Sequence, residues 1–574
     1  MINILRTLFF ILAPIGIIFL VGYSGSENED RLTYFPVERE SNIANDIDAL
    51  KEKVSFRDVS IFAPADDAVN DRALMEFAAD VSKMQIESSS LNTLYSEKPA
   101  AINFNIPSEK GNVKLVLERV NILDGGFRFT SNDGGTIIKH NYTPGIHYRG
   151  IIEGDNRSIA AISVFPGFVM GIISNEEGNF NLGSVKDANG NHTSEYIYYN
   201  DVNVLDKKEF NCGVDDYDPK FRVDNPNVNN APLEFDNNSG LADTIRVYFE
   251  CDFAMYQNNG SNLNATGQYV EGMFNAVSTI YRNESLPTSI SEVRVHTQTD
   301  PYTNTTNSFT VLESFGHNTQ DNFYGDLAHF LSGRNIQAGG VAWINVLCVP
   351  YQSQQGAGRY AYSNIENNNS LPYPVYSWPV NVVAHEMGHN VGSNHTHACV
   401  WPVFGPSSRA AIDSCYDAEG NCFNGRRPRL NGTIMSYCHL EGSVSLAAGF
   451  GPLPGDTIRH RYQQAGCLQQ STNISEPEAF FLDQNFPNPF NPGTNIRFEL
   501  PMESIITLSV FDISGREVAK LVNGEFRNSG SFTYYFDAAR FSLASGVYFY
   551  RINALDPSNS QNNFTQVKKM ILIK

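Results

Sequence analysis

Apolar and polar positions alternate with a period of two in the first part of the chain. Short alternating runs, separated by Gly, Asn and Asp, extend from Ile102 to about residue 174 and are typical of antiparallel strands. One amphipathic helix is expected before them, at Asp71–Met84. We therefore predict a small antiparallel β domain, with strands at Val113–Val120, Phe127–Thr130, Thr136–Lys139, His147–Ile152, Ser158–Val164 and Phe168–Ser174.

Residues 241–470 mix the helical and the strand period. Helices are expected at Ala265–Tyr281 and Ser377–Val391, and strands at Thr244–Cys251, Arg294–Thr297 and Gly340–Val349, which indicates an α/β domain. After residue 480 the alternation returns and predicts a β-sandwich. Its strands are expected at Asn495–Leu500, Ile505–Asp512, Phe532–Asp537, Val547–Ala554 and Gln566–Ile573.

The chain has 574 residues, enough for three or four domains. Two polar segments without periodicity separate the patterned parts, and the first of them is rich in Asn and Pro. The predicted organisation is multidomain: a mostly-β domain at 26–225, a linker at 226–240, an α/β domain with a mixed sheet at 241–470, a linker at 471–479 and a C-terminal β-sandwich at 480–574.

The first residues decide the expected compartment. Leu5–Val21 is almost wholly apolar, and small residues follow at Gly22–Ser26, which is the layout of a secretory signal peptide at 1–25. The alternative is a permanent membrane anchor. Pro14 and Gly16 interrupt the apolar run and no basic cluster follows it, so we favour a cleaved signal and export.

Charge and cysteine usage narrow the function class. Asp and Glu number 62 against 41 Lys and Arg, which gives a net charge of −21. This balance argues against nucleic-acid binding, because phosphate contacts require a basic face. All 8 cysteines lie between Cys212 and Cys467, and in an exported protein most of them should form disulfides.

The strongest chemical signal is the motif HEMGHNVGSNH at residues 385–395. On the predicted helix, a spacing of four places His385 and His389 on one face, where a single Zn²⁺ can bind both. Gly392 lets the chain leave the helix, and His395 then returns as a third ligand. The alternative, a helix with surface histidines, is disfavoured by the added glycine and third histidine.

This ligand set also predicts a reaction. Three neutral imidazoles leave the fourth zinc position open for water, as in catalytic rather than structural sites. Glu386 lies beside the metal rather than toward it, so it can take a proton from the activated water and return it to the leaving amine. The predicted cofactor is one catalytic Zn²⁺, and the predicted reaction is hydrolysis of a peptide bond.

The extended motif resembles the metzincin superfamily of zinc endopeptidases. The resemblance includes a turn at Gly432–Tyr437, in which Met435 stands for the methionine beneath the metal. Tyr437 stands where astacin-like and serralysin-like members place a tyrosine near the metal, which implies a phenol that hydrogen-bonds the oxyanion. The alternative is an ordinary buried tyrosine.

Within the superfamily, residues 243–468 most resemble the bacterial reprolysin- or adamalysin-like proteases. The resemblance rests on Ala328–Arg334 and on Gly339–Ala342, followed by Cys348. It implies that an extended substrate lies along the edge strand at Gly340–Trp343, where free backbone groups accept many sequences.

Two positions depart from the family pattern. Thr396 follows the third histidine, where many members have Asp, and Arg246 aligns with a calcium-binding Glu, so calcium stays undecided. The resemblance also implies three disulfides, with Cys251 left over as a buried thiol: Cys348–Cys467, Cys399–Cys438 and Cys415–Cys422.

Cys212 stands apart from the other cysteines, in a Cys-Gly-Val sequence just before the first linker. This resembles the cysteine-switch segment of metzincin propeptides, and the strand-like residues from His147 to Ile173 resemble a reprolysin prodomain. A thiolate is a strong zinc ligand and would displace the water, so residues 26–225 are predicted to be the propeptide of a latent zymogen. The alternative is a Cys212–Cys251 disulfide.

The last module resembles the type A C-terminal sorting domain of the type IX secretion system, a route across the outer membrane. The resemblance implies that the secretion machinery is a partner, whereas the sequence pattern alone indicates a small, adhesive β-sandwich. The matching segments are Leu482–Pro492, Val510–Arg516, Ala544–Tyr550 and Lys568–Met570.

Together these features predict a secreted or cell-surface zinc metalloendopeptidase, made as a latent zymogen, that acts on proteins or peptides. The rival hypothesis is a catalytically silent surface binding or adhesion protein on a metzincin scaffold. Glu386 favours the enzyme, since inactive relatives commonly lose this residue. The sequence indicates neither the cleavage specificity nor the oligomeric state.

Overall fold

The computed structural model describes three regions of the chain: an N-terminal region (40–222), a central region (244–468) and a C-terminal region (480–573). The described residues are 40–65, 72–187, 190–205, 212–216, 218–222, 244–302, 307–334, 339–365, 372–403, 409–420, 422, 431–440, 443–468, 480–485, 488–502, 504–527, 530–541, 543–556 and 563–573. The predicted signal peptide and both predicted linkers lie outside them. Among the described residues, no helix is long and apolar enough to cross a membrane.

Most of the N-terminal region forms one ten-stranded sheet, antiparallel except where β1 pairs with β4. Helices α1 (Asn42–Lys51) and α3 (Ser88–Glu97) accompany it. In order across the sheet, the strands are β1 (Arg57–Ser60), β4 (Ala101–Ile106), β5 (Val113–Val120), β8 (Ile146–Ile152), β9 (Asp155–Phe165), β10 (Phe168–Asn175), β11 (Gly178–Lys186), β12 (His192–Asn200), β3 (Ser82–Ile86) and β2 (Phe62–Pro64). The strands expected between residues 113 and 174 are confirmed.

The helix expected at Asp71–Met84 is wrong over its second half. Helix α2 spans only Arg72–Phe77, and Asp80 has a positive φ of 52° that ends any helical run. Ser82, Met84 and Ile86 are buried in alternation in β3, so the two-residue period decides the structure here.

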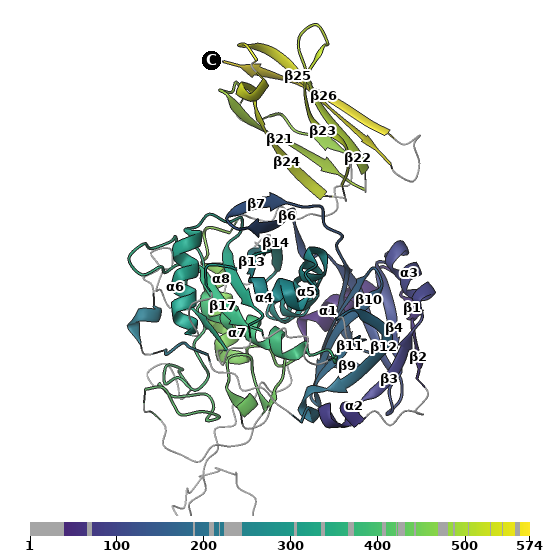
Figure 1. The fold of residues 1–574 in the computed structure, drawn as a ribbon, viewed down its shortest axis with the longest axis vertical. Helices are drawn as coiled ribbons and strands as arrows, with labels where there is room; N and C mark the ends of the chain where they lie inside the picture. Colours follow the sequence, from purple (N-terminus) through teal and green to yellow (C-terminus); the bar gives the residue numbers. More distant parts are fainter. Residues whose placement is uncertain are drawn as a thin grey trace, which may run out of the picture.

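The central region is built on a seven-stranded sheet that also contains two N-terminal strands. In order, its strands are β16 (Gly340–Ala342), β17 (Tyr360–Asn364), β15 (Leu327–Ser332), β13 (Ile245–Cys251), β14 (Thr288–His296), β6 (Leu123–Asp133) and β7 (Thr136–Lys139). Neighbouring strands from β17 to β6 are parallel, and β16 and β7 are antiparallel to their neighbours. The N-terminal region, predicted as a separate unit, therefore completes one edge of the central sheet (Figure 1).

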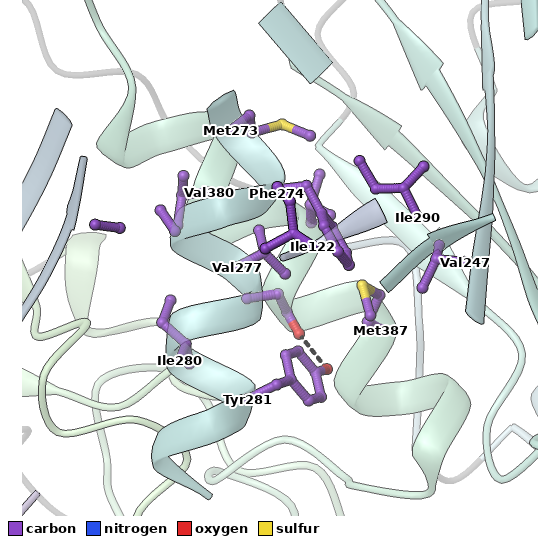
Figure 2. Close-up of a cluster of buried hydrophobic side chains, with 14 of the residues drawn as sticks. Ile122, Val247, Met273, Phe274, Val277, Ile280, Tyr281, Ile290, Val380 and Met387 are labelled. Carbon is purple, nitrogen blue, oxygen red and sulfur yellow. Dashed lines mark hydrogen bonds between the residues drawn. The ribbon is translucent and has the colours of Figure 1, made fainter. Parts of the chain in front are cut away.

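Helix α5 (Leu263–Asn283) lies between the two sheets and presents a different face to each. One apolar face packs on the central region, and Figure 2 shows Phe274 pointing toward Ile290 of β14. On the opposite face, buried Glu271 lies 2.7 Å from His147 of β8, and Asn275 donates to Ser163 Oγ at 3.1 Å. The N-terminal region thus meets the central region through buried polar groups and through a shared apolar cluster.

Helix α7 (Ser377–Val391) matches the predicted helix but has no N-cap side chain of its own. The N-terminal region supplies the cap: Asn181 Oδ1 of β11 accepts the N–H groups of Tyr376 and Ser377, each at 2.8 Å. These N–H groups would otherwise have no helical partner. Helices α4 (Phe253–Asn258), α6 (Ser308–Thr319) and α8 (Pro452–Gln463) complete the central region.

The strand expected at Gly340–Val349 ends early, at Ala342. Beyond it, Asn345 and Cys348 have positive φ values of 60° and 70°, which turn the chain out of the sheet. The N–H groups of Asn345 and Val346 instead donate to the carbonyl oxygens of His389 and Asn390, at 2.9 and 2.8 Å. The continuous apolar pattern here reflects packing against the end of α7, not strand pairing.

Two of the three predicted disulfides are wrong. The structure contains Cys348–Cys467, as expected, but pairs Cys399 with Cys422 and Cys415 with Cys438. A parallel β-bridge joins Ala398 to Glu419, and this pairing brings Cys422 close to Cys399. Cys415 is then left beside Cys438, with 4.8 Å between their Cα atoms.

The C-terminal region contains two small sheets that share one apolar cluster. One sheet holds β20 (Phe481–Leu482), β21 (Gly493–Leu500) and β24 (Gly530–Asp537); the other holds β23 (Glu517–Arg527), β22 (Ser504–Phe511), β25 (Gly546–Leu555) and β26 (Asn563–Leu572). The five predicted strands lie within these elements or within one residue of them. Strand β24 lies next to β6, so this region sits over the β6–β7 edge (Figure 1).

We predict that Asn181→Ala loosens the start of α7, because Tyr376 and Ser377 lose their acceptor. A lost cap costs about 1 kcal/mol, which corresponds to roughly fivefold faster amide exchange at the helix start. Hydrogen exchange of peptides covering residues 372–380 measures this effect. Asn156→Ala, at the exposed start of β9 in the N-terminal region, is the matched control and should leave the exchange unchanged.

Candidate functional site

Helix α7 and the turn after it bring the three predicted imidazoles together. His385 and His389 lie one turn apart, and Gly392 ends the helix with a φ of 110°, a conformation that favours glycine. His395 returns toward them, with its Nε2 3.1 Å from His389 Nε2. One ligand atom from each histidine and from Cys212 lies within 4.8 Å of the others, and all four residues are buried.

The backbone sets which nitrogen of each imidazole faces the centre. His385 Nδ1 lies 2.7 Å from the carbonyl oxygen of Ile434, and His389 Nδ1 lies 2.9 Å from that of Ser393. Each Nδ1 therefore carries the proton, and the Nε2 lone pairs face the common point. Burial, followed by the neighbouring imidazoles, lowers the pKa of His385 and His389 well below the ordinary value, so both rings stay neutral.

Glu386 lies at the same centre but between α7 and the edge strand. A Cβ added to Gly340 of β16 would be 2.3 Å from Glu386 Oε1, so only glycine allows this approach. Glu386 Oε1 is buried and has no hydrogen-bond partner among the described residues. Burial raises the pKa of this carboxyl to about 8, a value suited to proton exchange near neutral pH.

Cys212 brings the end of the N-terminal region into the cluster. Its Sγ lies 3.7 Å from both His389 Nε2 and Glu386 Oε2, and the next N–H, from Gly213, donates to the carbonyl of Gly340 at 2.7 Å. Burial raises the pKa of the thiol to about 12, so it ionises only beside a strong cation. The alternative Cys212–Cys251 disulfide is absent, and Cys251 is a separate buried thiol.

The predicted turn lies beneath this cluster. Met435 is fully buried, and its carbonyl accepts from the N–H and the hydroxyl of Thr396, at 3.0 and 3.2 Å. The residue that departs from the family pattern thus ties the third histidine to the turn. Tyr437 donates its hydroxyl to the Cys212 carbonyl at 3.2 Å, and burial raises its pKa far enough to keep the phenol protonated.

Two carboxylates at the site were missed by the sequence analysis. Asp216 Oδ2 accepts the N–H of His395 at 2.7 Å and lies 3.4 Å from its Nδ1. Glu419 Oε1 lies 3.3 Å from the same Nδ1 and 3.4 Å from His397 Nε2, while its Oε2 accepts the N–H of Asp216 at 3.2 Å. Asp216 lies four residues after Cys212, which is a signal, but Glu419 lies in a loop without any periodic pattern.

These carboxylates act on the third imidazole. Burial disfavours the charged ring, but Asp216 first, then Cys212 and Glu419, outweigh it and raise the pKa of His395. An imidazole whose Nδ1–H points at carboxylates is a more basic ligand through Nε2. The donor set of nitrogen and sulfur, with a partnerless Glu386 oxygen beside it, fits a zinc ion.

Comparison with known proteins assigns the central region. Residues 242–445 match the family model described as metallo-peptidase family M12. The chain contains an M12 metallopeptidase domain. Such peptidases use zinc, so the predicted enzyme class is confirmed at the level of this domain. Residues 484–573 match a secretion system C-terminal sorting domain, which confirms the second predicted resemblance and supports export.

One curated relative is a disintegrin and metalloproteinase domain-containing protein 19 from Mus musculus, 26% identical over 167 residues. The match covers 27% of this chain and 16% of that protein, so the chain spans only a small part of its relative.

Solved structures give weak likenesses. One is archaemetzincin from Methanopyrus kandleri, with 15% sequence identity and a TM-score of 0.18; the match covers 29% of this chain and 83% of that chain. Another is latent PorU from Porphyromonas gingivalis, with 20% identity and a TM-score of 0.14; the match covers 17% of this chain and 9% of that chain. Such scores add nothing to the assignment.

Arg246 occupies the M12 position that the resemblance associates with a calcium-binding Glu. Its guanidinium donates to both oxygens of Asp326, at 2.9 and 3.0 Å, and these side chains are largely buried. The Asp326 carboxylate therefore already has a cationic partner within the protein.

We predict that Glu419→Ala weakens zinc binding about 10- to 100-fold, the usual cost of losing a partner of a ligating imidazole. The loss of zinc affinity should be largest after the N-terminal region is removed, because Asp216 then no longer contacts His395. Chelator competition on the cut and uncut protein measures both affinities. Glu313→Ala on α6 removes the same charge outside the cluster and should change neither; equal affinities for Glu419→Ala and wild type would contradict the prediction.

Proposed function

We propose that the protein is a secreted zinc metalloendopeptidase, made as a latent zymogen, that hydrolyses peptide bonds in proteins. The observation that carries this proposal is the convergence of His385, His389 and His395 Nε2 atoms beside the Glu386 carboxylate, within an M12 domain. Zinc held by these imidazoles supplies the Lewis acid that activates water and polarises the scissile carbonyl.

The chain's own groups would divide the remaining work. Glu386 accepts the proton of the attacking water through its partnerless oxygen and later returns it to the leaving amine. Tyr437 remains protonated and already donates to a carbonyl oxygen, that of Cys212. Once that segment leaves, the same hydroxyl can donate to the oxyanion of the reacting carbonyl.

Substrate would bind as an added strand. β16 is an edge strand, and residues of the N-terminal region already pair with its backbone through the Gly213–Gly340 hydrogen bond and with Ile344, just beyond its end, through the Phe221–Ile344 hydrogen bond. Backbone pairing at an edge holds an extended peptide regardless of most side chains, which suits an endopeptidase.

Latency follows from the same contacts. Cys212 occupies the space that water needs beside Glu386, and the N-terminal region also covers the substrate edge. Cleavage in the 226–240 linker would remove the covalent connection that holds the N-terminal region at the site. The sorting domain supports delivery by type IX secretion to the medium or the cell surface.

Two variants distinguish the proposed enzyme from the rival role, a catalytically silent binding protein on the same scaffold. His389→Ala should lose the single zinc ion, whereas Glu386→Ala should retain zinc and lose proteolysis, because Glu386 is a base and not a ligand. Elemental analysis and digestion of a protein substrate by the processed variants measure the two effects. Zinc bound normally by His389→Ala would refute the site, and normal turnover by Glu386→Ala would place the base elsewhere.

We predict that Cys212→Ser produces a precursor that is active before linker cleavage, because a hydroxyl is a far weaker zinc ligand than a thiolate. Activity of the uncut precursor on a quenched fluorescent peptide library measures this effect. Cys251→Ala, which changes the other free cysteine, should keep the precursor silent. A silent Cys212→Ser precursor that becomes active on cutting would show that coverage of β16, rather than the thiol, maintains latency.

A further inference from the structure

The last described residues of the N-terminal region continue along the substrate edge beyond Cys212. Arg222 forms a β-bridge with Ile344, and the carbonyl of Phe221 accepts the N–H of Ile344 at 2.9 Å. This register places the Phe221 side chain against the central region, where it is only 1% exposed. A residue at the end of an inhibitory segment is therefore buried as deeply as the core.

The walls around Phe221 are aromatic and belong to the M12 domain. Its ring packs edge-on against Phe309 of α6, with 5.1 Å between ring centroids, and lies 6.5 Å from Trp343. Lys220 Nζ covers the outer side, 4.7 Å from the Phe221 centroid and 5.1 Å from that of Phe309. Phe309 and Trp343 stay with the enzyme after cleavage in the linker, whereas Phe221 and Lys220 leave.

We infer that the space filled by Phe221 is a substrate subsite for one aromatic side chain of the bound peptide, with Phe309 and Trp343 setting the preference. This inference rests on the proposed peptidase function and adds its substrate class. A peptide added to the same edge brings side chains to the same wall, and an aromatic ring restores the burial that Phe221 provided. A carboxylate there would be desolvated without a partner.

The register also gives the distance of this subsite from the reacting bond. Glu386 meets the edge at Gly340, and Ile344 lies four residues further along, about 13 Å at the usual strand rise. The preferred aromatic residue should therefore lie about three to five residues from the scissile bond, on one side only. This subsite places no restriction on the two residues that flank the scissile bond.

The first experiment measures cleavage by the processed protein. Starting from one cleaved peptide, Phe, Leu, Ala and Asp are placed in turn at each position three to five residues from the scissile bond on both sides. One position should favour Phe over Ala at least tenfold in kcat/KM and disfavour Asp further, because burial of an aromatic ring is the main gain. Equal rates for Phe and Ala at every position would overturn the inference.

Two variants locate the effect. Phe309→Ala should reduce the preference for Phe over Ala to about twofold or less, because one wall is lost. Phe323→Ala, an equally truncated aromatic of the same apolar cluster that packs on Tyr248 instead, should keep the full preference. A preference that survives Phe309→Ala would place the aromatic ring elsewhere.

A binding measurement separates this inference from the proposed function. The probe is a synthetic peptide of residues 212–222 with Cys212→Ser, added to processed Glu386→Ala protein. Its binding is followed by intrinsic tryptophan fluorescence, to which Trp343 contributes together with Trp378 and Trp401. The peptide should bind at least tenfold more tightly than its Phe221→Ala version. If the protein cleaves nothing yet shows this difference, the subsite stands and the peptidase proposal fails. Equal binding of the two peptides would reject the subsite whatever the cleavage result.

Discussion

The convergence of three imidazoles and a thiol on one buried point is the constraint on which the rest of the structure depends. Two of the imidazoles have their Nδ1 protons committed to backbone carbonyls, so their Nε2 lone pairs can be satisfied only by a cation or a shared proton. Burying such a donor set is costly without a metal. Zinc binding and folding of this region are therefore expected to be coupled.

The N-terminal region surrounds this centre from several directions at once. Cys212 and Asp216 reach the ligands, Asn181 caps the helix that carries two of them, and β6 extends the sheet beneath. Many of these contacts are hydrogen bonds between polar groups, which water can replace after separation. The two regions also share a large apolar cluster, so their separation would expose apolar surface as well.

Local chemistry explains which features the sequence predicted. The helix at Ser377–Val391 and its three histidines follow from spacing alone, because the ligands lie within one turn and one loop of each other. Glu419 could not be predicted, since its approach to His395 depends on the fold of an irregular, disulfide-bonded loop. The wrongly predicted disulfide pairs, in which Cys422 and Cys438 stood in each other's place, have the same origin, because the β-bridge between Ala398 and Glu419 brings Cys422 rather than Cys438 to Cys399.

Long-range pairing explains why the sheet that the two regions share could not be predicted from the sequence. Strand β6 follows β5 and precedes β8 in the chain, both of the ten-stranded sheet, so nothing local indicates that it pairs with β14, far along the chain. The sequence pattern predicts that the segment is a strand, but the long-range pairing with β14 places it in its sheet. Residues 123–139 of the N-terminal region therefore belong to the central sheet.

The shared sheet has a consequence for the separated enzyme. When β6 and β7 depart, β14 is left as a bare edge, with a row of backbone donors and acceptors from Ile290 to His296 turned toward water. Such an edge is a template for pairing with any other extended chain. Separation of the N-terminal region, as proposed, would therefore change the colloidal behaviour of the molecule, because the remaining M12 domain would carry a self-association surface at β14, on the edge of its sheet opposite β16.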